Sequence, residues 1–164
     1  MHDPVGPALL VWLETTALAV AMREGLWLYP IVEIVHIAGF VLLVGAAAMF
    51  DLRLLGVARG LDVGALARFL LPWSRLGLAV AVPSGLLMFS AHATEMIENP
   101  AFQLKLALIL AAGVNAWAFH RGVFRHAASW PPGAATPPGA RAAAVASLAL
   151  WLGVIACGRL LAYL

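Results

Sequence analysis

Four long apolar stretches dominate the sequence, at residues 26–50, 70–91, 101–119 and 142–164. Each is close to the roughly 20 residues that an α-helix needs to cross the hydrocarbon core of a bilayer. Hydrophobic residues make up 63% of the chain and charged residues 11%, and the mean hydropathy is +0.95. A water-soluble fold of this composition would expose too much apolar surface. We therefore expect an all-α fold, a polytopic membrane four-helix bundle that forms a single membrane domain over residues 1–164.

The segment 7–22, ahead of the first stretch, is apolar but too short to span a bilayer comfortably. It carries Glu14, Thr15 and Thr16 on its more polar side. We expect this segment to lie on the outer membrane surface as an N-terminal interfacial helix. A fifth span is the alternative.

Capping residues and prolines indicate where helices begin and end in the rest of the chain. Asp62 is a candidate N-cap for a short helix over 61–71 that ends before Pro72. Asn99 can cap the third spanning helix in the same way. The proline-rich stretch 129–139 is expected to be a non-helical loop.

The arginines indicate the orientation in the membrane. The connections after the first and third stretches, with the residues beside them, contain seven arginines, against two on the opposite side. The positive-inside rule makes the arginine-rich side cytoplasmic, so both termini are expected to be periplasmic. The seven are Arg53, Arg59, Arg68, Arg75, Arg121, Arg125 and Arg141.

The composition and the motifs restrict which partners and which reactions are expected for this chain. The calculated pI of about 9.2 reflects arginines at membrane ends rather than one solvated patch. We therefore expect the lipid bilayer as a partner, and we expect no binding to nucleic acid. A second copy of the chain or another membrane protein is an open alternative. Phosphate-binding loops, dinucleotide fingerprints, zinc-protease helices and nucleophile elbows are absent from the sequence.

Ionisable residues at membrane depth are costly and usually face the bundle interior, so they are the candidate functional groups. On the outer side, His36 lies about 9 Å below the membrane boundary by helix rise. Glu33 is one turn away, and Lys105 comes to a similar depth on the third span. One hypothesis is a ligand, proton or metal site centred on His36. The alternative is a buried Glu33–Lys105 ion pair, with His36 bonded to a carbonyl or hydroxyl.

A second group of polar residues belongs to the inner side of the bundle. Because arginine near a helix end can pair with lipid phosphate, headgroup contacts are the simpler interpretation of this polar network. Asn115 is deeper and is interpreted as a helix–helix hydrogen bond. The network consists of Asp51, Arg53, Ser74, Arg75, Asn115 and His120.

Haem b or copper is the cofactor hypothesis for the outer site. A haem held in a four-helix bundle takes axial ligands from facing helices at similar depth, and Met88 and His92 are the candidates opposite His36. Imidazole and thioether also suit copper, for which Met96 is a further candidate ligand. A site without any cofactor is also an alternative.

Several motifs resemble a family of small bacterial inner-membrane proteins that has no assigned function. They are Val32-Glu33-Ile34-Val35-His36-Ile37-Ala38-Gly39, Asp51-Leu52-Arg53-Leu54-Leu55-Gly56, Leu71-Pro72-Trp73, Asn99-Pro100-Ala101-Phe102-Gln103-Leu104-Lys105 and Phe119-His120. The resemblance implies a multi-pass protein of the bacterial inner membrane. A looser similarity reaches copper-resistance D-type and cytochrome b561-type bundles, but the b561 pattern of paired histidines is missing on the cytoplasmic side.

Three functions are compatible with this sequence. The first is a redox or metal-handling protein that uses His36, and the second is a non-enzymatic small-solute or proton transport subunit. The third is a structural membrane module whose polar groups fix how the helices pack.

Overall fold

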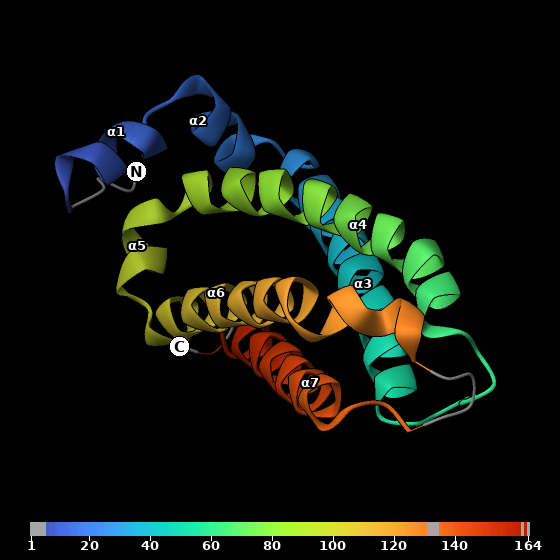
Figure 1. Ribbon diagram of the computed structural model, residues 1–164. Coiled ribbons are helices and arrows are strands. Elements are labelled where there is room, and N and C mark those ends of the chain that lie inside the picture. The colour runs from blue at the N-terminus through green and yellow to red at the C-terminus, as the bar shows by residue number, and fades with distance from the viewer. Residues whose placement is uncertain (1–5, 131–134, 162, 164) are drawn as a thin grey trace.

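The computed structural model describes residues 6–130, 135–161 and 163. These residues form helices and no strand, which confirms the predicted all-α fold (Figure 1). Four helices are long and apolar enough to cross a membrane, so the protein is a multi-pass membrane protein. The helices are α1 (Ala8–Glu14), α2 (Ala17–Glu24), α3 (Leu28–Leu54), α4 (Val63–Ala91), α5 (Ala93–Glu98), α6 (Pro100–Arg121), the 3₁₀ helix η1 (Val123–Ser129) and α7 (Pro138–Leu160).

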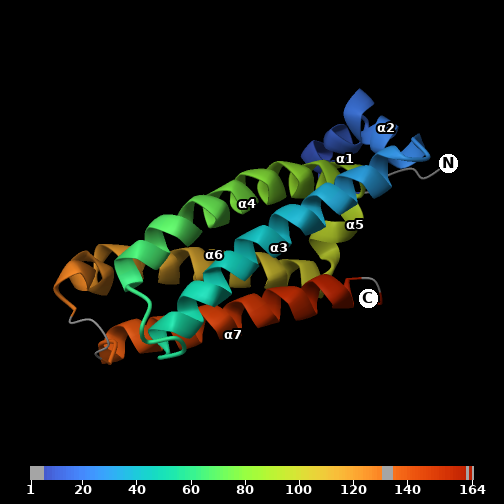
Figure 2. The ribbon, with the colours of Figure 1, turned by 90° about the vertical axis from the view of Figure 1, so that its right-hand side faces the viewer.

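The four spanning helices form two antiparallel hairpins, α3 with α4 and α6 with α7. Packing of α3 against α7 joins the hairpins, and the rings of Phe40 and Trp151 meet there edge to face at 6.0 Å. Helices α4 and α6 meet through the stacked rings of Phe89 and Phe102, whose centroids lie 5.4 Å apart. Figure 2 shows α1, α2 and α5 at one end of the bundle, here called the α5 end. The α3–α4 connection and η1 lie at the other, the η1 end.

Close approach of α3 and α4 depends on two glycines. A Cβ atom on Gly77 would lie 2.6 Å from the carbonyl oxygen of Gly39, and one on Gly39 would lie 2.9 Å from the backbone nitrogen of Ala81. Real Cβ contacts essentially never come so near. Small residues of this kind allow helix backbones to pack tightly inside a membrane, where van der Waals contact drives association.

Helix α4 corrects the expected short helix over 61–71, because it runs unbroken through Pro72. Asp62 caps this helix as predicted, since its carboxylate accepts a hydrogen bond from the backbone N–H of Ala65 at 2.6 Å. An interior proline removes one intrahelical hydrogen bond at a cost of about 3 kcal/mol. Val63 and Ala67 belong to the buried apolar cluster at the η1 end. We attribute the continuity of α4 to this packing, which offsets the cost of the proline.

The N-terminal segment is two short helices rather than the single one expected. The Thr16 hydroxyl accepts a hydrogen bond from Ala19 N–H at 3.3 Å and so caps α2. Thr15 and Thr16 also donate to the carbonyls of Trp12 and Leu13. These local bonds compete with helix continuation and break the segment. Neither α1 nor α2 by itself is long enough to span a bilayer, and neither is among the four described helices that could cross one. The interfacial position of this segment stays a prediction.

Helix α7 begins earlier than expected, inside the stretch 129–139 that was interpreted as a loop. Pro138 is its first residue and Pro137 its N-cap. Proline fits the first helical turn, whose N–H groups have no intrahelical partner. Residues 131–134 of the predicted loop lie outside the described part of the chain.

A polar contact fastens the N-terminal helices to the α5 end. The buried carboxylate of Glu14 accepts hydrogen bonds from the backbone N–H of Thr94 at 2.6 Å and from its hydroxyl at 2.8 Å. Arg23 donates to the backbone oxygens of Glu14 at 2.8 Å and of Ala91 at 3.0 Å. We call Glu14, Thr94 and Arg23 the clasp, because these three residues join α1 and α2 to the α4–α5 junction.

Candidate functional site

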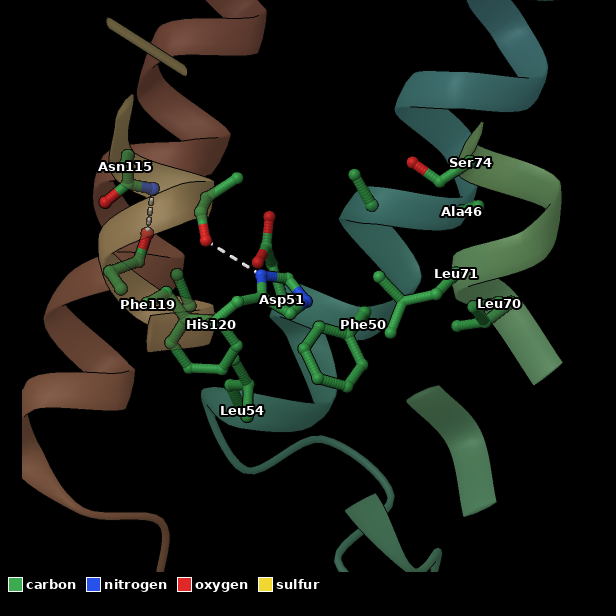
Figure 3. A pocket seen from close by; sticks show the side chains of 14 residues that line it. Ala46, Phe50, Asp51, Leu54, Leu70, Leu71, Ser74, Asn115, Phe119 and His120 are labelled. Atoms are coloured by element: carbon green, nitrogen blue, oxygen red, sulfur yellow. Dashed lines mark hydrogen bonds between the residues drawn. The ribbon is translucent and has the colours of Figure 1, made fainter. Parts of the chain in front are cut away.

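A pocket lies inside the bundle near the η1 end (Figure 3). Its volume is about 120 Å³, and all four spanning helices contribute to its wall. Most of the wall is apolar, and the polar side chains that face the pocket come from α3, α4 and α6. They are Asp51, Ser74, Asn115 and His120.

Asp51 reaches this pocket from the last turns of α3. Its side chain is only 7% exposed, and the oxygen Oδ2 is buried without a hydrogen-bond partner in the described part of the chain. The Ser147 hydroxyl on α7 makes a side-chain hydrogen bond with the carboxyl. A buried carboxylate with an unmade hydrogen bond and no paired cation is costly.

Arg53 is only two residues away but does not neutralise this carboxyl. Its Nε donates to the carbonyl of Leu61 at 2.7 Å, and one terminal nitrogen donates to the carbonyl of Arg59 at 3.1 Å. The side chain is 5% exposed. Arg53 therefore holds the α3–α4 connection in shape. This differs from the expected contact with lipid phosphate, because a buried guanidinium with backbone partners is not presented to headgroups.

His120 enters the pocket from the last turn of α6. Its Nδ1 lies 2.8 Å from the carbonyl oxygen of Ala116, which can only accept, so Nδ1 is assigned the proton. In the neutral ring Nε2 then carries a lone pair, and this atom is buried with no hydrogen-bond partner in the part of the chain that the structure describes. The ring packs against Phe119 at 5.3 Å and Phe124 at 5.2 Å between centroids.

The pocket thus holds two buried acceptor atoms with unmade hydrogen bonds, Oδ2 of Asp51 and Nε2 of His120. Figure 3 shows the two side chains reaching the same space from α3 and α6. No hydrogen bond joins them within the described structure. Two such acceptors need a hydrogen-bond donor between them. A proton, a water molecule or a ligand with N–H or O–H groups can supply it.

The other inner residues have structural partners or face outward. Asn115 donates to the carbonyl of Ala143 at 2.9 Å and links α6 to α7, the helix–helix bond expected for it. Ser74 lines the pocket from α4. Arg75 is exposed on the surface of α4 and does not reach the pocket.

The structure brings His36 of the outer group against α4. Its Nδ1 lies 2.9 Å from the carbonyl oxygen of Ala81 and 3.1 Å from the Ser84 hydroxyl. A Cβ on Gly85 would lie 3.0 Å from the ring, so the imidazole rests directly on the α4 backbone. This is the carbonyl-and-hydroxyl environment that the sequence offered as the alternative to a ligand site.

Lys105 and Glu33 do not form the ion pair that was the alternative for this group. Glu33 is exposed on α3, whereas Lys105 is half-buried on α6. Lys105 points toward α7 instead. A Cβ on Gly158 would lie 3.8 Å from the Lys105 Nζ. The outward position of Glu33 on its helix separates the expected partners.

Two of the remaining proposed haem or copper ligands, His92 and Met96, lie at the α5 end. The His92 ring meets Tyr29 edge to face at 6.2 Å, and His92 and Met96 line an open pocket at the α5 end. Met88 is half-buried on α4. Across the described residues no group of three or more His, Cys, Asp or Glu side chains is arranged to hold a metal ion. A cofactor on His36 stays a prediction.

Comparison with protein families places the chain in a family. The model described as "Family of unknown function (DUF6644)" covers residues 9–164, almost the whole chain. The chain belongs to this family. No curated protein and no solved structure matches it. The looser similarity to copper-resistance D-type and cytochrome b561-type bundles therefore gains no support.

Sequence reasoning had included Asp51 and His120 but interpreted their group as headgroup contacts. It also missed Phe124, which covers His120, and Ser147, which bonds Asp51. The available signal was that Asp51 and His120 end two helices that run in the same direction, so both come to the same level of the bundle.

Proposed function

We propose that this membrane protein binds and transfers a proton through the Asp51–His120 pocket, as a small proton transport subunit. One observation carries the proposal. Two titratable side chains from different spanning helices face one cavity, and each has a buried atom without a hydrogen-bond partner among the described residues. Buried titratable groups with unmade hydrogen bonds in a membrane protein are typical of proton relays.

The chemistry of the pair needs one exchangeable proton. With the proton on Nε2 of His120, the imidazolium faces the Asp51 carboxylate and the charges cancel. With the proton on Oδ2 of Asp51, both groups are neutral. The cavity has room for water between them. A bridging water that accepts from one group and donates to the other would move the proton between the two states.

An aromatic cluster lies beside the pocket on the side of the η1 end. The rings of Phe50, Phe119 and Phe124 contact one another with centroids 5.4–6.0 Å apart. Phe124 belongs to η1 and also packs on His120. Apolar rings exclude water, so this cluster would slow proton exchange between the pocket and that side of the membrane.

The distribution of charge supports a cytoplasmic η1 end. Arg59 and Arg68 lie on or beside the α3–α4 connection, while Arg121 and Arg125 lie at the end of α6 and in η1. The α5 end instead carries Glu95 and Glu98. We propose from this asymmetry that the protein sits in a bacterial inner membrane with its termini in the periplasm.

Proton transfer can be measured on the purified protein in liposomes that contain a pH-sensitive dye. We expect the wild type to dissipate an imposed pH gradient faster than empty liposomes, and Asp51→Asn and His120→Gln to reduce the rate about 100-fold or more, as for loss of a general acid or base. Asp62→Asn is the matched control. It keeps a good N-cap at an exposed aspartate of the same end and should retain the wild-type rate.

Infrared difference spectra between acidic and neutral pH add an independent readout. A protonated carboxyl signal that Asp51→Asn removes and Asp62→Asn preserves would support the assignment. Equal proton flux in all variants, together with no carboxyl signal from Asp51, would refute the proposal.

A further inference from the structure

The Asp51–His120 pocket has a composition that selects among cationic ligands, and this inference rests on the proposed function of the same site. We propose that the pocket also accepts a small ammonium-type cation with N–H donors, such as ammonium or a short primary alkylammonium. Its N–H groups would supply the donors that Oδ2 of Asp51 and Nε2 of His120 lack.

Both unmade bonds are of the same kind. Nδ1 of His120 is committed as a donor to Ala116, which leaves Nε2 as an acceptor. The free carboxylate oxygen of Asp51 is an acceptor as well. A ligand that bridges them must donate at least two hydrogen bonds. An ammonium group does so, and it also brings the positive charge that the buried carboxylate lacks.

Metal cations fit this pocket poorly. Calcium takes six to eight oxygen ligands and magnesium demands near-octahedral oxygen coordination. The pocket presents one carboxylate, the Ser74 hydroxyl and the Asn115 amide, which together offer fewer oxygen ligands than either ion takes. Zinc sites use at least three His, Cys or carboxylate ligands, and the lining contains only Asp51 and His120 of these types.

The walls suit the remainder of such a ligand. Side chains of Phe50, Phe119, Leu70 and Leu71 line the pocket, so an alkyl group would contact apolar surface. A cation near an aromatic face is also attracted by the ring quadrupole. The volume of about 120 Å³ exceeds what a bridging proton requires and allows for a group of several heavy atoms.

The experiment compares three salts at equal ionic strength on the full-length protein in detergent micelles. Methylammonium chloride carries N–H donors, tetramethylammonium chloride has the same charge without them, and sodium chloride is the bare-ion reference. Binding to the folded state raises Tm. We expect methylammonium to give a saturable rise of about 2–4 °C, and the other two salts to give no comparable rise.

Variants locate the effect. Asp51→Asn should abolish the rise caused by methylammonium, while Asp62→Asn should keep it. Equal stabilisation by methylammonium and tetramethylammonium, or a rise that survives in Asp51→Asn, would overturn the proposal. The comparison of salts on the wild type decides the question even if Asp51→Asn does not fold. Proton flux that depends on Asp51 without any methylammonium effect would leave the proposed function standing and remove only this ligand.

Discussion

The carboxylate of Glu14 accepts both the backbone N–H and the hydroxyl of Thr94, a residue 80 positions further along the chain. Burial by itself raises the pKa of Glu14. The two hydrogen bonds from Thr94 and the nearby charges of Arg23 and His92 outweigh burial and hold the pKa below the ordinary value of 4.5. The clasp is therefore formed by the ionised side chain.

The clasp predicts acid sensitivity of the α5 end. Because folding lowers the pKa of Glu14, its contribution to the free energy of unfolding is complete above about pH 4.5 and is lost as the pH falls through the lower folded-state value. Glu14→Gln should lower stability at neutral pH by about 1–3 kcal/mol and should flatten this acid limb. Thermal unfolding as a function of pH measures both effects. Glu24→Gln, an exposed control, should behave like the wild type.

The crossing of α3 and α4 predicts that Gly77→Ala destabilises the bundle. Its Cβ would collide with the backbone of α3 at Gly39, and forced overpacking costs about 1–3 kcal/mol or more. Gly45→Ala is the control on α3, since nothing lies within 4 Å of its added Cβ. Helix propensity makes that change neutral or stabilising by up to about 1 kcal/mol. Denaturant or thermal unfolding in micelles should separate the two variants, and equal stability would contradict the close approach.

The aromatic cluster predicts a faster proton pathway when Phe124 is truncated. Phe124→Ala removes the ring that packs on His120 and opens the pocket toward the η1 end. We expect proton flux in liposomes to rise several-fold while Asp51→Asn in the same background abolishes the gain. Phe69→Ala, at an exposed position on α4, should leave flux unchanged. A flux unaltered by Phe124→Ala would show that this ring does not limit access.

Orientation can be tested because the chain has a single cysteine, Cys157. In a Cys157→Ala background, a single cysteine can be introduced at one of two exposed positions. Glu98 lies at the α5 end and Gly60 lies at the η1 end. An impermeant thiol reagent added to intact cells should label Glu98→Cys but not Gly60→Cys. The opposite pattern would reverse the proposed topology.

The hypothesis of haem b or copper on His36 makes a spectroscopic prediction. The purified protein should show a Soret band, or bound copper by metal analysis, that His36→Ala abolishes and that Met88→Ala or His92→Ala weakens. His126→Ala, on η1, should change nothing. A folded His36→Ala protein with no loss of colour or metal would restrict His36 to its packing role against Ala81 and Ser84.

Local sequence patterns were sufficient to predict the helices themselves. The four spans follow from apolar runs of bilayer length, and they lie close to the predicted ranges. Asp62 and Asn99 cap helices in the structure, as their sequence positions indicate. These features depend on hydrophobicity and on hydrogen bonds across two to four residues, which neighbouring residues determine by themselves.

Only the tertiary structure decided which polar groups meet and which are left without a partner. Whether Glu33 reaches Lys105 depends on the rotation of α3 and α6 about their axes, and whether Pro72 ends a helix depends on the packing around Ala67. The cavity between Asp51 and His120 is likewise the space that four packed helices leave unfilled. Such relationships arise from contacts between residues far apart in the chain, so local patterns do not determine them.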